Sequence, residues 1–302
     1  MSRAARTTGA LISALRPRAW TKNLFVPAAL IFSRRWEPEA ILWTAAATAG
    51  FCLLSSSIYL INDIVDREKD RLHPEKRARA IASGALPAGT AAVAAALMSL
   101  TVLALSALLA RRFLIAAGAY LASHIAYSMG LRRVVILDVL LIAMGFVLRA
   151  MAGVAVLQDA GYEMFISPWL LICTFFLAIF LAFSKRRSEV VLLGEGASRH
   201  RESLREYSPQ LLDEMISIAT AASVLGYSIY TVSERTVSMV SGNLYITIPF
   251  VAFGVFRYLY LVHEKGQGGS PEKLLLKDFP LFLNILLWLA SVLLVLILFP
   301  AQ

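Results

Sequence analysis

Cysteine and histidine are both scarce in this sequence, which has two cysteines and four histidines among 302 residues. Cys52 and Cys173 lie far apart, each within an apolar segment and outside any CxxC pair. This spacing supports neither a disulfide framework nor a zinc site. We therefore expect both cysteines to be small core residues.

Charged residues are also scarce. They make up 16% of the chain, whereas 58% of the residues are hydrophobic and the mean hydropathy is +0.68. Such a composition excludes an ordinary soluble domain. It predicts an all-α, polytopic membrane protein, because lipid-exposed backbone must satisfy its own hydrogen bonds. Nine apolar runs are candidates to cross a bilayer, at about 22–34, 40–62, 88–110, 113–130, 134–157, 168–184, 211–233, 243–262 and 279–299.

No second soluble domain is evident, and one domain is expected over residues 1–302. Residues 1–21 lack the apolar core and cleavage site of a secretory signal, and they predict a basic, amphipathic, cytoplasmic lead-in. Of the 29 lysines and arginines, 22 fall at one set of span ends, five at the opposite set and two within spans. The positive-inside rule then places the N-terminus and the polar loops 63–87 and 185–210 in the cytoplasm, in an integral inner (cytoplasmic) membrane protein. These two loops are expected to be partly helical caps over the bundle. The net charge of +9 suits membrane lipids and phosphate-bearing substrates, and it requires no nucleic acid.

One apolar run ends in an unusual polar stretch, SSSIYLINDIVDREKDRLHPEKRARAIASG, at residues 55–84. Asn62, Asp66 and Asp70 recur at four-residue intervals and would share one helix face, while Asp63 would point elsewhere. Convergent carboxylates repel each other unless a cation lies between them. Mg²⁺ fits best, because it prefers oxygen ligands and commonly bridges carboxylates to substrate phosphates. The alternative is a solvated helix end, in which the aspartates pair with Arg67, Lys69 or Arg71.

The segment NDIVDREKD resembles the NxxxDxxxD signature of the UbiA-type intramembrane prenyltransferase superfamily. Three further segments agree: RPRAWTKN at 16–23, RARAIASG at 77–84 and YSMGLRRVVILD at 127–138. The resemblance follows the whole chain in order. It implies a UbiA-like bundle of nine spans that holds a magnesium-bound pyrophosphate. Ala80 stands where many relatives have proline, which should alter loop stiffness rather than chemistry.

Residues 182–191, AFSKRRSEVV, depart from this pattern. Relatives that use a prenyl diphosphate carry a second aspartate-rich motif here, whereas Lys185, Arg186 and Arg187 favour an extra phosphate. With LDVLLIAMGFVLRAMAG at 137–153, the segment resembles the decaprenyl-phosphate phosphoribosyltransferase branch. That resemblance implies a donor, phosphoribosyl pyrophosphate, with a 5-phosphate as well as a pyrophosphate. It also implies a polyprenyl phosphate acceptor.

Candidate site residues follow from these motifs. Asn62, Asp66 and Asp70 are expected to be catalytic and to bind Mg²⁺. The substrate-binding candidates are Lys22, Tyr59, Lys76, Arg79, Tyr127, Arg132, Asp138, Lys185 and Arg186. For Arg77, Arg133 and Arg187, a role in topology or lipid binding is an equal alternative. No strong base is expected, because a phosphate monoester is already anionic near neutral pH.

Other polar residues stand inside or near the apolar runs. Arg149 either reaches a polar pocket or snorkels to the far interface. His124 is expected to pack within its span, and Asn284 to hydrogen-bond between helices. His73 has either a role in substrate closure or a structural role in its loop.

Two other functions stay open. A superfamily member could move a prenyl group from its diphosphate to an aromatic or other small acceptor, but residues 182–191 should then carry aspartates. An ion-coupled transporter would use the aspartates as an ion site, and inverted repeats or paired broken helices would favour it. Neither feature is evident in the sequence. A homo-oligomer is compatible with either function.

Overall fold

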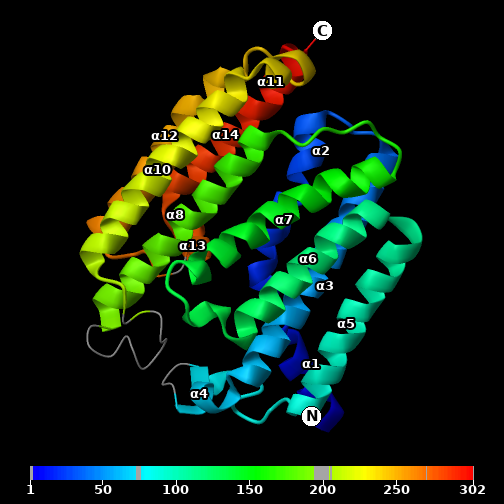
Figure 1. Cartoon of the computed structure of the whole chain (residues 1–302), viewed down its shortest axis with the longest axis vertical. Coiled ribbons are helices and arrows are strands. Elements are labelled where there is room, and N and C mark those ends of the chain that lie inside the picture. Colours follow the sequence, from blue (N-terminus) through cyan, green and yellow to red (C-terminus); the bar gives the residue numbers. More distant parts are fainter. Residues whose placement is uncertain (1–2, 73–75, 194–203, 205, 270, 302) are drawn as a thin grey trace. The chain divides into compact units, whose positions relative to one another are not determined.

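The computed structural model describes residues 3–72, 76–193, 204, 206–269 and 271–301. Every regular element in these residues is a helix, which confirms the predicted all-α fold (Figure 1). The chain divides into two compact units. The first comprises Met1–Ala28, Glu37–Leu131 and Leu148–Glu163, and the second Ala29–Trp36, Arg132–Val147 and Met164–Gln302. This division does not test the prediction of a single domain, because one helix, α7 (Leu137–Asp159), contributes to both units.

The first unit is built around the long helix α3. Its elements are α1 (Arg3–Ala14), η1 (Pro17–Phe25), α3 (Pro38–Val65), α4 (Arg67–Leu72), η2 (Lys76–Ala78), α5 (Ala88–Leu109), α6 (Arg111–Met129) and the second half of α7. Helix α3 packs against both α5 and α6. Phe51 of α3 is fully buried, and its ring meets Phe113 of α6 edge-on with the centroids 5.7 Å apart. Ser99 of α5 donates a 2.9 Å hydrogen bond to Ser57 of α3, so the buried hydroxyls satisfy each other.

The second unit has its most extensive packing between α8 and α10, which run side by side (Figure 1). Its elements are most of α2 (Ala28–Ser33), the first half of α7, α8 (Pro168–Leu193), α10 (Pro209–Val232), α11 (Glu234–Met239), η6 (Leu244–Thr247), α12 (Ile248–His263), α13 (Pro271–Lys277) and α14 (Phe279–Leu298). Gly226 allows the close approach of α10 to α8, because a Cβ at this position would lie 3.4 Å from the Cα of Cys173. The Asn284 side chain donates to the Phe250 carbonyl at 2.9 Å. This bond links α14 to α12 and confirms the predicted interhelical role of Asn284.

Seven helices in the described residues are long and apolar enough to cross a membrane: residues 38–65, 88–109, 137–159, 168–192, 209–232, 244–263 and 279–298. They match seven of the nine predicted spans and confirm a polytopic membrane protein. The predicted span 113–130 is also a helix, α6, but Arg111, Arg112 and His124 make it less apolar than the seven.

The first predicted span, 22–34, is not one helix. It is divided between the 3₁₀ helix η1, which ends at Phe25, and the short helix α2, which begins at Ala28. Pro27 lies between them. Proline has no N–H to donate to the carbonyl four residues earlier, and its ring crowds that carbonyl, so helical hydrogen bonding is interrupted at this position.

Helix α8 extends well beyond its predicted end at residue 184. It continues to Leu193, so the SKRRSE segment at the start of the predicted cap loop 185–210 is helical, as expected for a partly helical cap. Lysine, arginine and glutamate are good helix formers, and neither glycine nor proline interrupts residues 185–193. The cations of this segment therefore have fixed helical spacing.

Candidate active site

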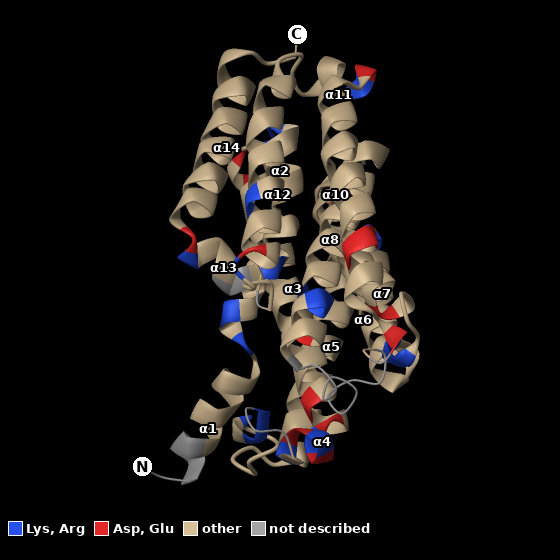
Figure 2. Ribbon diagram, turned by 90° about the vertical axis from the view of Figure 1, so that its left-hand side faces the viewer, with Lys and Arg blue, Asp and Glu red and all other residues tan. Residues whose placement is uncertain are grey.

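The asparagine–aspartate motif lies where α3 ends and α4 begins. The Asp66 N–H donates to the Asn62 carbonyl at 2.9 Å, and the Asp70 N–H donates to the Asp66 carbonyl at 2.8 Å. The four-residue hydrogen-bond register thus continues through the turn at Asp66, where φ is −90° and ψ is 4°. Asn62, Asp66 and Asp70 therefore follow one another a turn apart, as the spacing predicted. Acidic and basic residues gather in and around α4 (Figure 2).

Asp63 also belongs to this charged group, which corrects the expectation that it points elsewhere. The Arg79 Nη1 atom lies 3.1 Å from Asp63 Oδ1 and 2.8 Å from Asp70 Oδ2, so one guanidinium bridges both carboxylates. Arg16 forms a second ion pair with Asp63. Positions seven residues apart differ by only about 20° around a helix, so Asp70 is closer in angle to Asp63 than to Asn62.

The pairing of Asp70 differs from that of a solvated helix end. Asp70 is 4% exposed, and its partner is Arg79, from beyond α4. Arg71 instead donates to Glu68 at 3.0 Å and to the Ala82 carbonyl at 3.2 Å. Helix α4 is thereby attached to the RARAIASG segment. The Ser128 hydroxyl of α6 donates to the Asn62 side-chain oxygen and so orients the first residue of the motif.

The donor set suits Mg²⁺ and suits zinc poorly. Among the described residues, no three His, Cys, Asp or Glu side chains form a metal-binding group. A metal at this junction would have the two carboxylates and one amide as its protein oxygens. Mg²⁺ commonly binds through one or two carboxylates and completes its shell with water and substrate phosphate. The residues present therefore fit this ion.

Arg149 lies in the polar interior of the first unit, which settles the choice left open by the sequence. It is 4% exposed, and it donates to the Asn23 side-chain oxygen at 2.8 Å and to the Tyr120 hydroxyl at 2.7 Å. His124 stacks on the Tyr120 ring with the centroids 4.2 Å apart, which confirms a packing role. Because Asn23 follows Lys22 directly, this network fixes the part of η1 that carries a predicted substrate-binding cation.

The other predicted residues of the first unit are half-buried. Lys22 lies in η1, Tyr59 on α3, Lys76 in η2 and Tyr127 on α6. The Arg16 guanidinium lies over the Tyr59 ring, 4.9 Å from its centroid. His73 lies outside the described residues.

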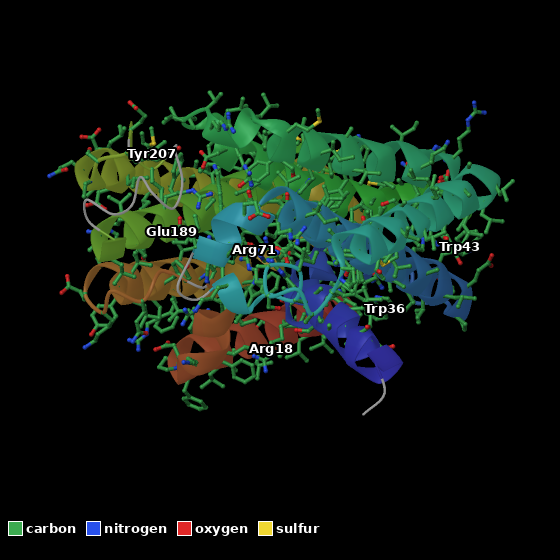
Figure 3. All side chains as sticks on the ribbon, turned by 90° about the horizontal axis from the view of Figure 1, so that it is seen from below. Arg18, Trp36, Trp43, Arg71, Glu189 and Tyr207 are labelled. Carbon is green, nitrogen blue, oxygen red and sulfur yellow. The ribbon has the colours of Figure 1, made fainter. Side chains whose placement is uncertain are left out.

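In the second unit, Arg186 is buried within an ion-pair network. Its Nε donates to Asp138 Oδ2 at 3.1 Å, and its Nη1 donates to Glu189 Oε2 at 2.8 Å. Asp138 is fully buried in the first turn of α7, and its other oxygen accepts from the Tyr207 hydroxyl at 3.0 Å. Glu189 on α8 and Tyr207 in the segment before α10 are labelled in Figure 3. Asp138 thus orients the Arg186 guanidinium.

The other cations of the second unit that the sequence singled out differ in their surroundings. Arg132 lies in the short 3₁₀ helix η3 (Leu131–Arg133), and Lys185 is half-buried on α8. Arg187 pairs with Asp213 of α10, whose Oδ1 also lies 3.0 Å from His263 Nε2. Arg187 therefore links α8 to α10 through an ion pair.

Tyr207 is a residue that sequence reasoning missed. It is an isolated tyrosine in a polar segment. It lies 69 residues after Asp138, and no helical or strand periodicity relates the two positions. The basic and acidic residues around it drew attention to the segment but not to this hydroxyl.

Comparison with known proteins identifies the family. Residues 24–190 match the model of the UbiA prenyltransferase family. The chain belongs to this family. It is 35% identical to the decaprenyl-phosphate phosphoribosyltransferase of Corynebacterium glutamicum, over 96% of this chain and 87% of that protein. It is 33% identical to the protein of the same name from Mycolicibacterium smegmatis, over 93% of this chain and 91% of the relative.

The fold of this UbiA family member agrees with that of a solved relative. A UbiA homolog from Archaeoglobus fulgidus, bound to DMAPP and Mg²⁺, superposes with a TM-score of 0.70 over 94% of this chain and 98% of that one. The sequences are 18% identical, so this likeness is one of fold.

Proposed function

We propose that this UbiA family member transfers the 5-phosphoribosyl group of phosphoribosyl pyrophosphate to a polyprenyl, decaprenyl-like phosphate and releases pyrophosphate. The observation that carries the proposal is the cationic end of α8, where Lys185 and Arg186 occupy a helix expected to hold aspartates in users of prenyl diphosphates. A donor with an additional phosphate matches these charges. The names of the two relatives that match nearly the whole chain support the same reaction.

The pyrophosphate end of the donor is assigned to the first unit. Asn62, Asp66 and Asp70 would hold Mg²⁺, which would neutralise the charge that builds on pyrophosphate as it leaves. The UbiA homolog solved with Mg²⁺ supports this assignment. Arg79 fixes the Asp70 carboxylate by bridging it to Asp63, and thus keeps the last residue of the motif in place. Lys22, Lys76 and Arg79 are the proposed cationic contacts to the donor, with Tyr59 and Tyr127 as hydroxyl donors.

The acceptor supplies its own nucleophile. An oxygen of the polyprenyl phosphate attacks C1 of the ribose as the bond from C1 to the pyrophosphate oxygen breaks. The product is a polyprenylphosphoryl 5-phosphoribose, and no proton has to be removed from the anionic attacking oxygen. Arg132, Lys185 and Arg186 are assigned to the 5-phosphate end of the donor, where their charge would orient the sugar.

This assignment predicts a selective effect at Lys185. Lys185→Ala should raise the KM for phosphoribosyl pyrophosphate about tenfold, because one charge-assisted hydrogen bond is lost, and should leave the KM for the lipid nearly unchanged. Lys185 is the cleaner site to change, since replacing Arg186 would also leave Asp138 without its buried partner. Lys265→Ala, in the exposed segment after α12, is the control. Equal donor KM values in Lys185→Ala and wild type would remove Lys185 from the donor site.

We also propose that the α3–α4 junction faces the cytoplasm, where a soluble, highly charged donor is available without crossing hydrocarbon. Leu72 is 89% exposed at the end of α4, and Met239 is 56% exposed on α11. Cysteine at position 72 should react with an impermeant thiol reagent in inside-out vesicles. Cysteine at position 239 should react in right-side-out vesicles. The parent protein gives the background, since Cys52 and Cys173 lie within helices. The reverse pattern would contradict the proposed orientation.

The reaction itself is tested by offering the purified protein two pairs of substrates. One pair is labelled phosphoribosyl pyrophosphate with decaprenyl phosphate, and the other is a labelled prenyl diphosphate with an aromatic acceptor. We expect a labelled lipid from the first pair in the presence of Mg²⁺. Efficient product formation from the second pair alone would instead assign a prenyl transfer.

A further inference from the structure

The Tyr207 hydroxyl joins three parts of the second unit. It accepts a 2.7 Å hydrogen bond from the Ile136 N–H, just before α7, and donates a 3.0 Å bond to Asp138 Oδ1. The Tyr207 side chain is buried, and its ring lies edge-on to Phe183 of α8 with the centroids 6.3 Å apart. One phenol therefore connects the segment before α10 to the start of α7.

The backbone at Ile136 is strained. Its φ of 69° lies in the left-handed region, which a β-branched residue adopts at a cost. Such a conformation persists when surrounding contacts hold it, and the bond from the Ile136 N–H to Tyr207 is such a contact. Arg132 lies four residues earlier, in η3, the 3₁₀ helix that precedes this turn. The position of this turn consequently depends on the Tyr207 hydroxyl.

The second bond of Tyr207 acts on α8. Asp138 holds Arg186 at 3.1 Å, and the Arg186 side chain is 3% exposed. Glu189, one turn further along α8, engages another nitrogen of the same guanidinium. Since Arg186 directly follows Lys185, the network fixes the rotation and position of the helical turn that presents Lys185.

The protonation state of Tyr207 suits both bonds. Burial raises the pKa of the phenol above its ordinary value, and the neighbouring Asp138 carboxylate raises it further. The phenol therefore keeps its proton in the neutral range. It can donate to Asp138 while its oxygen accepts from the Ile136 amide.

We infer that Tyr207 is a positioning residue for the sugar-phosphate end of the donor. Its hydroxyl sets the Ile136 turn, which follows the η3 helix that carries Arg132, and, through Asp138 and Arg186, it sets the α8 turn that carries Lys185. The inference rests on the proposed function for the identity of the ligand. Arg186 then acts at this end of the donor through the network in which Asp138 and Glu189 engage its guanidinium.

The test compares two ligands that represent the two ends of the donor. Ribose 5-phosphate carries the sugar phosphate alone, and inorganic pyrophosphate with Mg²⁺ represents the leaving group. In Tyr207→Phe, the affinity for ribose 5-phosphate should fall roughly tenfold, and the affinity for pyrophosphate should change less than about twofold. Both are measured by titration calorimetry on the full-length protein in detergent. With both substrates present, the donor KM should rise more than kcat falls.

Tyr227→Phe is the matched control. Tyr227 is also a buried tyrosine of the second unit with two hydrogen bonds, 2.6 Å to Thr247 and 3.1 Å from Trp288. Its loss should lower the melting temperature without weakening ribose 5-phosphate binding. If Tyr227→Phe weakens that binding as much as Tyr207→Phe, or if both ligands are weakened equally in Tyr207→Phe, the positioning role is wrong.

A second variant separates positioning from folding. Glycine adopts a positive φ readily, so with Ile136→Gly the turn should keep its conformation without a hydrogen bond to the Tyr207 hydroxyl. Adding Ile136→Gly to Tyr207→Phe should recover part of the lost ribose 5-phosphate affinity, and no recovery would overturn the role of the strained turn. Because these titrations need no turnover, a wild-type protein that binds ribose 5-phosphate but makes no labelled lipid would refute the proposed reaction alone.

Discussion

Replacing Asp66 with asparagine should lower turnover roughly 10²- to 10³-fold, the scale expected when one charge-stabilising group of a transition state is lost. The substitution keeps the shape of the side chain but removes the charge assigned to Mg²⁺. Asp66 is half-buried at the turn between α3 and α4, and its backbone bond to Asn62 does not depend on the carboxylate. The variant should therefore fold normally, with a melting temperature in detergent close to that of the wild type.

Glu68→Gln is the control for this prediction. Glu68 is an exposed acid two residues away, and its partner is Arg71. Its neutralisation should leave both turnover and the dependence of rate on Mg²⁺ concentration near the wild-type values, whereas EDTA should abolish turnover of every variant. If Asp66→Asn retains near-wild-type activity, or if Glu68→Gln loses as much, the metal site is not at this junction.

Arg79→Ala should be the most destabilising change among the surface cations, at about 3 kcal/mol. It removes the bridge between Asp63 and Asp70, whose side chains are 4% and 5% exposed, and leaves Asp70 without this partner. Arg79→Lys should recover only part of the loss, because Nη1 makes both contacts and the lysine side chain, one atom shorter, does not extend as far. The measurement is the unfolding free energy of purified protein in a fixed detergent.

A double substitution shows whether the bridge is the cause. In Arg79→Ala with Asp70→Asn, no buried negative charge remains at position 70, so the combined loss should be smaller than the sum of the single losses. Arg77→Ala, at an exposed position of η2, should have little effect on stability. Additive losses for the Arg79 and Asp70 changes would show that the bridge contributes nothing measurable.

The sequence predicted those features that depend on local pattern. Apolar runs located seven spans because hydropathy and length alone decide whether a helix can cross a membrane. The four-residue spacing of Asn62, Asp66 and Asp70 is also a local feature. It is kept through the turn between α3 and α4 because a backbone hydrogen bond joins each aspartate to the motif residue four positions earlier. The break at Pro27 was also readable in principle, because a proline interrupts the hydrogen bonding of the helix that precedes it.

Features that depend on tertiary contacts were not predictable in this way. Arg79 reaches Asp63 from 16 residues away, and Tyr207 reaches Ile136 from 71 residues away. Neither pairing has a periodic signal. The predicted span ends at residue 184, where the charges begin, whereas α8 continues to Leu193, because lysine, arginine and glutamate have high helix propensity.

The fate of two labels on the same donor tests the proposed reaction most directly. Phosphoribosyl pyrophosphate is prepared with ³²P either in the 5-phosphate or in the β-phosphate of the pyrophosphate, and each form is incubated with the purified protein, Mg²⁺ and decaprenyl phosphate. We expect the 5-phosphate label in the lipid extract and the β-phosphate label in soluble pyrophosphate, in equal amounts. A β-phosphate label in the lipid, or no lipid label from either donor while a prenyl diphosphate is consumed, would contradict transfer of the 5-phosphoribosyl group.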